Sequence, residues 1–193
     1  MLQEAAIDQR RAATPTRLRL GAVPLGLAAA GLVAADWGSS LAGATLAPGG
    51  PLDETAHVLT ALLVLWSLGQ RRCERFLVPA LIASVAIDLD HVPGELGANW
   101  LTAGTPRPYT HSVLTIAAVL AGAVVWRRRR DVLLGVTLGL ALHLWRDTSE
   151  SGNGVSLFWP FSYRSVRLSH TGYLAVIGLV VAVNAYRVRV GRP

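Results

Sequence analysis

Three ionisable residues, Asp88, Asp90 and His91, stand within four positions at the end of the apolar run "FLVPALIASVAI". Charged groups are costly in such a segment unless they are paired or bind a cation. Asp88 and His91 are spaced i, i+3, and His143 and Asp147 in "HLWRD" are spaced i, i+4. Each spacing places both side chains on one helix face, where they can bind a single ion. Imidazole with carboxylate, without thiolate, suits zinc, manganese or iron, and carboxylate-rich subsites also take magnesium.

Two further histidines extend this set of candidate metal ligands. The seven candidates are His57, Asp88, Asp90, His91, His111, His143 and Asp147. A catalytic zinc uses about three protein ligands, so seven would hold one or two ions. We expect a divalent metal, zinc first, with manganese or magnesium as alternatives. Two ions would suit a phosphoryl displacement, in which they clamp the attacking and leaving oxygens.

The same residues also have a purely structural interpretation. "DLDH" and "HLWRD" could form ion pairs at helix ends. Carboxylates are disfavoured at the negative end of a helix dipole, however, and a bound cation would relieve that conflict. For His57, which has Asp53 four residues before it, the two interpretations are level. His170 has no neighbouring carboxylate in the sequence, so we expect a structural hydrogen bond there.

The composition indicates a membrane protein. Apolar residues make up 52% of the 193 and charged residues only 16%, against about 25% charged in soluble domains. Six apolar segments predict an all-α bundle of about six transmembrane helices: Leu18–Asp36, Asp53–Leu68, Phe76–Asp90, Tyr109–Trp126, Val132–Asp147 and Thr171–Tyr186. A bilayer span needs about 20 apolar residues. Several segments are at or below that length, so a soluble helical bundle is the alternative.

The arginines alternate along the chain in a way that orients these segments. With the N-terminus in the cytoplasm, fourteen arginines fall on the inner side, and the outer side carries only Arg107, Arg146, Arg164 and Arg167. This positive-inside pattern predicts a multi-pass membrane protein with both termini in the cytoplasm. All five histidines fall on the outer side. The run "WRRRRD" becomes a cytoplasmic turn, so we expect no nucleic-acid partner despite the net charge of +6.

We expect one membrane-embedded domain covering residues 1–193. It would comprise a cytoplasmic tail at 1–17, a first span at 18–36 and a last span at 171–186. The first segment, which ends near "LAGA", also resembles a secretory signal peptide, either cleaved or kept as an anchor. Pro93 and Gly94 are expected to end the third helix and begin an outer loop.

Four short motifs occur in order along residues 52–161: "AHVLT", "DLDH", "YTHS" and "HLWRDTSESGNGVSLFWP". Together they resemble the YdjM-like family of inner-membrane metal-dependent hydrolases. The match carries over to Thr110, Ser112 and all seven candidate ligands. Arg107 keeps the family's arginine, whereas Pro106 replaces a histidine and Ile87 a proline. The resemblance implies metal-dependent hydrolysis without naming a substrate.

The resulting hypothesis is a membrane-bound hydrolase whose metal site faces the extracytoplasmic side. The metal would lower the pKa of a bound water and polarise a substrate oxygen. We favour a phosphoester, either a small molecule or a lipid, because the site opens at the depth of the lipid headgroups. Asp90 would be a ligand or the general base. Arg107, Arg146 and Ser112 would contact the substrate, although each arginine could equally neutralise local carboxylates.

Two other functions fit the same sequence. One is a non-catalytic membrane scaffold or regulator with a vestigial metal site, which Pro106 favours. The other is an ion or proton transport protein, because ionisable residues within membrane helices often mark ion routes. The ionisable residues crowd one surface, and the inner halves of the segments are nearly all apolar. This arrangement disfavours a conduit.

Overall fold

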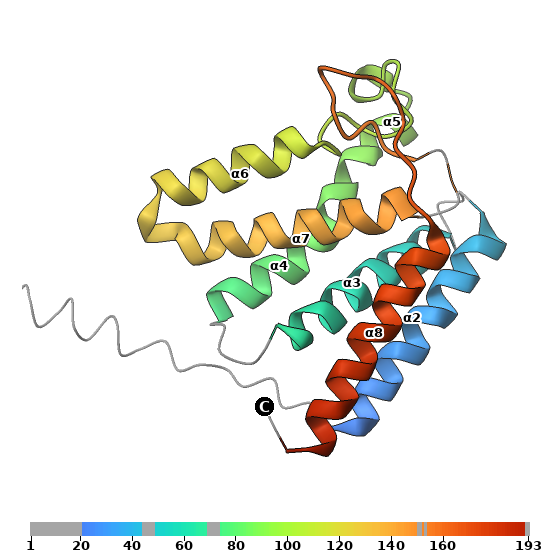
Figure 1. Cartoon of the computed structure of the whole chain (residues 1–193). Coiled ribbons are helices and arrows are strands. Elements are labelled where there is room, and N and C mark those ends of the chain that lie inside the picture. The colour runs from blue at the N-terminus through green and yellow to red at the C-terminus, as the bar shows by residue number, and fades with distance from the viewer. Residues whose placement is uncertain (1–20, 44–48, 69–73, 150–151, 153, 192–193) are drawn as a thin grey trace, which may run out of the picture.

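A computed structural model describes residues 21–43, 49–68, 74–149, 152 and 154–191. Within these ranges the chain is helical, and one isolated bridge, between Val155 and Val166, is its only β-type pairing. Each of the six apolar segments contributes one long helix (Figure 1): α2 (Ala22–Ala42), α3 (Gly49–Ser67), α4 (Glu74–Ala86), α6 (Val113–Val125), α7 (Arg130–Ser149) and α8 (His170–Arg189). The prediction of an all-α helical bundle is confirmed.

Two helix boundaries differ from the predicted segments for local reasons. Helix α2 continues past Asp36 to Ala42, and the Ser39 and Ser40 hydroxyls donate to the carbonyls of Asp36 and Trp37 within it. It ends before Gly43, whose φ of 66° few other residues adopt. Helix α6 begins at Val113, four residues later than expected, because the Ser112 side chain accepts from the Thr115 N–H and caps it.

The end of the third helix was predicted wrongly. Pro93 and Gly94 do not terminate it, because α4 ends earlier, at Ala86. A 3-10 helix follows at Ile87–His91, and the short helix α5 (Val92–Glu95) continues from it. Pro93 lies in the first turn of α5, where the missing N–H would have no helical partner in any case. Asp88, Asp90 and His91 therefore lie on a 3-10 helix.

Two apolar clusters hold the bundle together. The first joins α2, α3 and α8 through Leu25, Leu32, Leu63 and Ile177. The second joins the end of α3 to α4 and α7, and Phe76 and Ala80 lie at its centre. In Figure 1, α6 and α7 form a hairpin, and α4 crosses beside α7. The two clusters fix the positions of α3 and α7, which carry His57, His143 and Asp147, and of α4, which leads into the 3-10 helix with Asp88, Asp90 and His91.

Three stretches within the described ranges are long and apolar enough to cross a membrane: α2, Glu74–Glu95 and α8. Helix α6 has 13 residues, so it extends about 20 Å, less than the roughly 30 Å of a bilayer core. Neither α3 nor α7 is among these stretches: α3 carries Asp53, Glu54 and His57, and α7 carries two arginines and two aspartates. The structure supports three of the six predicted spans, and the other three remain a prediction.

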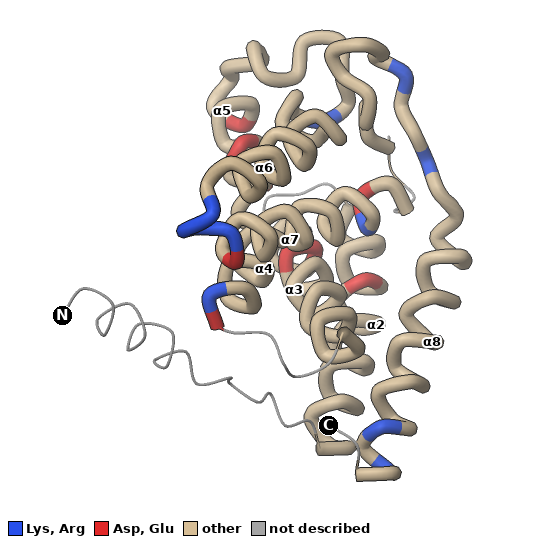
Figure 2. Tube along the Cα trace, turned by 60° about the vertical axis from the view of Figure 1, so that its left-hand side comes forward, with Lys and Arg blue, Asp and Glu red and all other residues tan. Residues whose placement is uncertain are grey.

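Most of the described arginines gather at one set of helix ends (Figure 2). Seven arginines of the expected inner side lie at the start of α4, at the α6–α7 turn and at the end of α8, and they are Arg75, Arg127, Arg128, Arg129, Arg130, Arg187 and Arg189. The other seven lie outside the described residues. Six of the seven candidate ligands lie at or beyond the opposite ends of α4, α6 and α7: Asp88, Asp90 and His91 follow α4, His111 precedes α6, and His143 and Asp147 lie in the last turns of α7.

Helices α4 and α7 approach so closely that only glycine fits at the contact. A Cβ on Gly135 would overlap the Phe76 carbonyl, and one on Gly139 would overlap the carbonyl of Ala80. Small residues serve this purpose at helix contacts in membranes. The contact places the final turns of α7 beside the end of α4.

We therefore expect Gly139→Ala to destabilise the protein by about 1–3 kcal/mol, because the added methyl overpacks the contact. The measurement is the thermal aggregation midpoint of detergent-purified protein. Gly178→Ala on α8 is the matched control, since a Cβ there meets nothing within 4 Å. Equal midpoints for the two variants would show that the α4–α7 contact is not tight.

Candidate metal centre

Four segments of the chain bring the seven predicted ligands together. Helix α3 supplies His57, and the 3-10 helix at Ile87–His91 supplies Asp88, Asp90 and His91. His111 comes from the loop that leads into α6, and α7 supplies His143 and Asp147. His57, His111, His143 and Asp147 are each no more than 1% exposed. Residues up to 90 positions apart in the sequence thus form one cluster.

The centre of the cluster is a ring of four side chains. His111 Nε2 lies 3.0 Å from Asp88 Oδ1 and 3.2 Å from His143 Nε2. Asp147 Oδ2 lies 3.2 Å from His143 Nε2 and 3.6 Å from His111 Nε2. His143 Nε2 also lies 3.4 Å from Asp88 Oδ1. Two imidazoles and two carboxylates therefore direct donor atoms at one small volume.

The backbone carbonyl of Ser84 fixes the orientation of the His143 ring. Its Nδ1 lies 2.9 Å from the Ser84 carbonyl oxygen. A carbonyl can only accept, so Nδ1 carries the proton, and Nε2 of the neutral ring presents its lone pair to the cluster. Metal-binding histidines are commonly held in this way by a partner of the second nitrogen. This contact depends on the close approach of α4 and α7.

Asp90 and His91 form the more exposed edge of the cluster. His91 Nδ1 lies 3.3 Å from Asp88 Oδ1 and 3.2 Å from Asp90 Oδ1. In a 3-10 helix, residues three apart are eclipsed, which explains why Asp88 and His91 meet. Asp90 also lies 3.4 Å from His111 Nδ1 and accepts a hydrogen bond from the Thr110 hydroxyl. Asp90 thus lies between the buried ring and the protein surface.

His57 closes the cluster from the side of α3. Its ring stacks on that of His143, with centroids 3.9 Å apart and an angle of 14° between the planes. His57 Nε2 lies 3.3 Å from Asp147 Oδ1. The sequence left a structural role and a ligand role equally open for this residue. His57 Nε2 also accepts a hydrogen bond from Arg146 Nη1 at 3.2 Å, which fits a structural role. Nδ1, which has no hydrogen-bond partner among the described residues, is the nitrogen left for a metal.

The donor atoms suit a divalent cation. Three overlapping groups each have their donors within 4.8 Å of one another: Asp88, Asp90, His91 and His111; His57, Asp88 and His143; and His111, His143 and Asp147. Both oxygens of Asp147 and Nδ1 of His57 are buried without a hydrogen-bond partner among the described residues. Buried polar atoms are rarely left unpaired, and a cation would satisfy the carboxylate. The seven residues therefore fit one or two metal ions.

The three predicted substrate contacts have different surroundings. Arg107, with a side chain 20% exposed, reaches from the loop before α6 to place Nη2 3.3 Å from Asp147 Oδ1. Arg146 is only 1% exposed, and its guanidinium contacts Asp36, Asp53 and His57. Ser112 is also 1% exposed and caps α6. Of the three, Arg107 alone combines proximity to the cluster with exposure.

Arg146 joins helices that are distant in the sequence. It donates to Asp53 on α3 and, at 3.1 Å, to Asp36 on α2. Asp36 also lies 3.0 Å from Nε2 of His170 at the start of α8. Asp36 is thus the partner of His170 in the structural role that the sequence predicted. These ion pairs tie α2 and α8 to the helices of the cluster, and a chain cleaved after α2 would lose them.

One acidic residue at the cluster was not among the predicted ligands. Glu54 on α3 lies beside Asp88, and its Oε2 is buried without a hydrogen-bond partner among the described residues. The sequence did contain a signal for Glu54, because Glu54 and His57 are spaced i, i+3 and share a helix face. Asp53, the neighbour considered from the sequence, lies 3.8 Å from His57 Nε2 and is engaged by Arg146.

The geometry predicts that purified protein carries a divalent metal and that His143→Ala loses it. His143 belongs to two of the three donor groups, and disturbing even a ligand's outer partner lowers metal affinity about 10–100-fold. We therefore expect at least that loss, measured by inductively coupled plasma mass spectrometry and metal titration. His170→Ala should keep the metal, since it belongs to none of the groups. Equal, sub-stoichiometric metal in wild type and His143→Ala would contradict the site.

Comparison with known proteins gives one match. A model of the family described as YdjM inner membrane protein matches residues 52–192, which extends the sequence resemblance from about residue 161 through α8. No curated protein and no solved structure matches the chain. Helix α2, with Asp36, lies before the matched region, and every residue of the cluster lies within it. The chain belongs to the YdjM inner membrane protein family.

Proposed function

We propose that this protein is a membrane-bound, metal-dependent hydrolase that acts on phosphoesters. The observation that carries the proposal is the convergence of seven histidine and aspartate side chains from four segments into overlapping donor groups. A single structural zinc would need four ligands in a closed site. Seven donors exceed that need, and the cluster has a more exposed edge at Asp90 and His91. Surplus ligands and an open edge favour catalysis over a structural ion.

The buried residues would hold the ion, and zinc is the first choice for this donor set. The ligands would be His57, Asp88, His111, His143 and Asp147, with His91 completing a second position. When bound, the metal supplies a Lewis acid and a more acidic water. Family membership supports an inner-membrane location.

Asp90 is the best candidate for the general base. The side chains of Asp90 and Asp88 are 14% and 13% exposed, whereas that of Asp147 is fully buried. Asp88 already contacts His111 and His143 in the ring, which leaves Asp90 for the proton. Thr110 donates to Oδ2 and fixes the carboxylate. In the proposed reaction a water oxygen bonds to phosphorus while the bond between phosphorus and the ester oxygen breaks. One water proton passes to Asp90, which returns it to the leaving oxygen. Arg107 would hold a phosphate oxygen through its guanidinium.

The distribution of arginine supports an extracytoplasmic site. Seven described arginines lie at helix ends away from the cluster, as Figure 2 shows, and positive charge marks the cytoplasmic side. A transport function is less well supported, because the buried ionisable residues form one cluster and no chain of them runs along the bundle within the described ranges. A vestigial site is also disfavoured, since Pro106 is exposed and the seven donors meet without it.

Asp90→Asn tests the base directly. General-base catalysis contributes about 10²–10⁴-fold, so we expect hydrolysis of bis(p-nitrophenyl) phosphate to fall at least about 100-fold while the bound metal stays. Asp131→Asn lies in the first turn of α7, at the end opposite His143 and Asp147. It should change neither the rate of hydrolysis nor the amount of bound metal. Loss of metal together with activity would make Asp90 a ligand. Full activity in Asp90→Asn would show that Asp90 is neither the general base nor a metal ligand. If wild type had no chelator-sensitive activity, a non-catalytic scaffold would be favoured.

The side of the site can be tested with two matched cysteines. In a Cys73→Ser background, Leu96→Cys and Val125→Cys place a thiol at positions that are 81% and 84% exposed. Leu96 lies beyond α5, on the side of the cluster, and Val125 ends α6 beside the arginine run. A membrane-impermeant maleimide should label only Leu96→Cys in intact cells. Labelling of Val125→Cys alone would invert the proposed orientation.

A further inference from the structure

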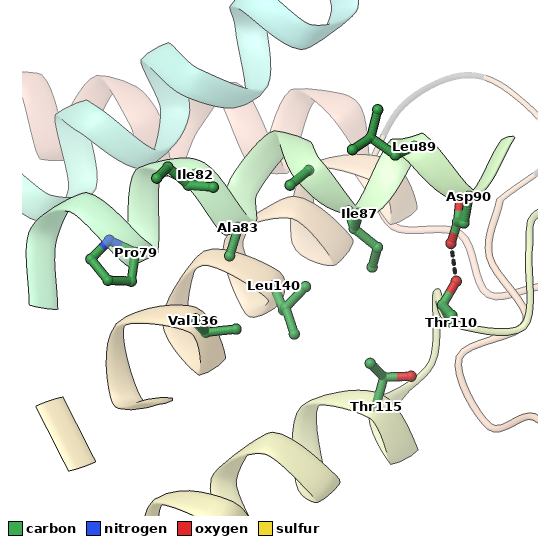
Figure 3. A pocket seen from close by; sticks show the side chains of 11 residues that line it. Pro79, Ile82, Ala83, Ile87, Leu89, Asp90, Thr110, Thr115, Val136 and Leu140 are labelled. Atoms are coloured by element: carbon green, nitrogen blue, oxygen red, sulfur yellow. Dashed lines mark hydrogen bonds between the residues drawn. The ribbon is translucent and has the colours of Figure 1, made fainter. Parts of the chain in front are cut away.

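A cavity of about 700 Å³ lies between α4, α6 and α7, next to the metal cluster. Figure 3 shows side chains from all three helices turned toward it. Eight of its eleven lining residues are apolar, among them Ile82, Ile87, Val136 and Leu140. The three polar ones, Asp90, Thr110 and Thr115, gather at one end. The cavity is therefore amphipathic along its length.

The apolar part of the cavity faces the region that a bilayer would occupy. Its α4 wall belongs to the candidate span Glu74–Glu95. Ile82 and Leu89 line it and are 57% and 70% exposed, so it opens at the side of the bundle. Its volume falls within the range of about 300–1,000 Å³ that is typical of small-molecule sites. A hydrocarbon chain could enter sideways from the membrane without crossing water.

The polar end connects the cavity to the proposed reaction. Asp90 lines the cavity and also belongs to one of the metal donor groups. Thr110, the donor to Asp90, lines the cavity as well. A molecule whose apolar chain lay along Val136 and Leu140 would therefore present its polar end to Asp90 and the cluster. This joins an apolar subsite to the position expected for the scissile bond.

We propose that the cavity is the subsite for one hydrocarbon chain of a membrane lipid, and that this lipid is the phosphoester substrate. The inference rests on the proposed hydrolase function and names its substrate class. Lipid tails are as apolar as the cavity wall, so moving a chain from bilayer to cavity gains little free energy. The cavity would act by orientation, because holding the chain positions the phosphoester at Asp90.

The test compares two phosphodiesters with the same leaving group, bis(p-nitrophenyl) phosphate and hexadecyl p-nitrophenyl phosphate, in one detergent. Val136→Trp fills the cavity from α7, and Ile82→Trp narrows it from an exposed position that leaves the core intact. For both variants we expect kcat/KM for the hexadecyl ester to fall about tenfold, with little change for the soluble ester. Val78→Trp, on α4 outside the cavity and 50% exposed, should match wild type.

A second readout reports chain binding without catalysis. Full-length protein in nanodiscs of phosphatidylethanolamine and phosphatidylglycerol is irradiated with a phospholipid that carries a diazirine midway along one chain. Labelling should map to residues 82–89 and 136–140 and fall about tenfold in Val136→Trp. Labelling confined to the outer faces of α2 and α8 would overturn the inference. In a Cys73→Ser background, a disulfide between two copies that carry Val136→Cys would do the same, since a second protein would then fill the cavity.

The two proposals fail in different ways. If the soluble ester is cleaved and the Trp variants lower both esters equally or neither, the chain subsite is wrong and the hydrolase stands. If wild type binds no metal and cleaves neither ester, the hydrolase is wrong, and with it the assignment of the lipid as substrate. Diazirine labelling of the cavity would then show only that the cavity holds a lipid chain.

Discussion

Carboxylates and imidazoles can be buried in an apolar bundle only when something replaces their lost hydration, and this requirement governs the end of the bundle that holds the cluster. Asp147 is fully buried with three histidine nitrogens and one arginine nitrogen nearby, and neither oxygen has a hydrogen-bond partner among the described residues. A divalent cation among these donors would compensate the carboxylates and use the free imidazole lone pairs. The proposed metal, base and substrate site all follow from that compensation.

The scaffold holds the cluster through a few close contacts. Gly135 and Gly139 let α7 approach the backbone of α4, and that approach places His143 against the Ser84 carbonyl. The 3-10 helix after α4 directs Asp88 and His91 at the same volume. A second set of ion pairs, centred on Arg146, fixes α2 and α8 around this core. Close contacts thus hold the segments that carry the clustered residues, as positioned chemistry requires.

Hydropathy predicted the six helices, and short-range spacing predicted two pairs of the clustered residues, Asp88 with His91 and His143 with Asp147, because both signals are local. His57 and His111 became candidates only through the placement of all five histidines on one side of the expected membrane. The rest depends on contacts between distant segments. Arg146 pairs with Asp36 and Asp53, which lie about a hundred residues earlier in the chain. No spacing rule could identify these partners. The 3-10 helix was missed because Pro93 and Gly94 suggested a helix end, although proline fits the first turn of α5. The cavity depends on how α4, α6 and α7 cross, which sequence alone does not specify.

X-ray absorption spectroscopy of the purified, membrane-extracted protein tests the metal centre most directly. We predict a first shell of nitrogen and oxygen at about 2.0–2.2 Å with the outer-shell scattering of imidazole and no sulfur. The histidine signal should be lost when His111 and His143 are both replaced by alanine. A sulfur shell from Cys73, or a spectrum unchanged by the two substitutions, would contradict a His/Asp metal centre in this protein.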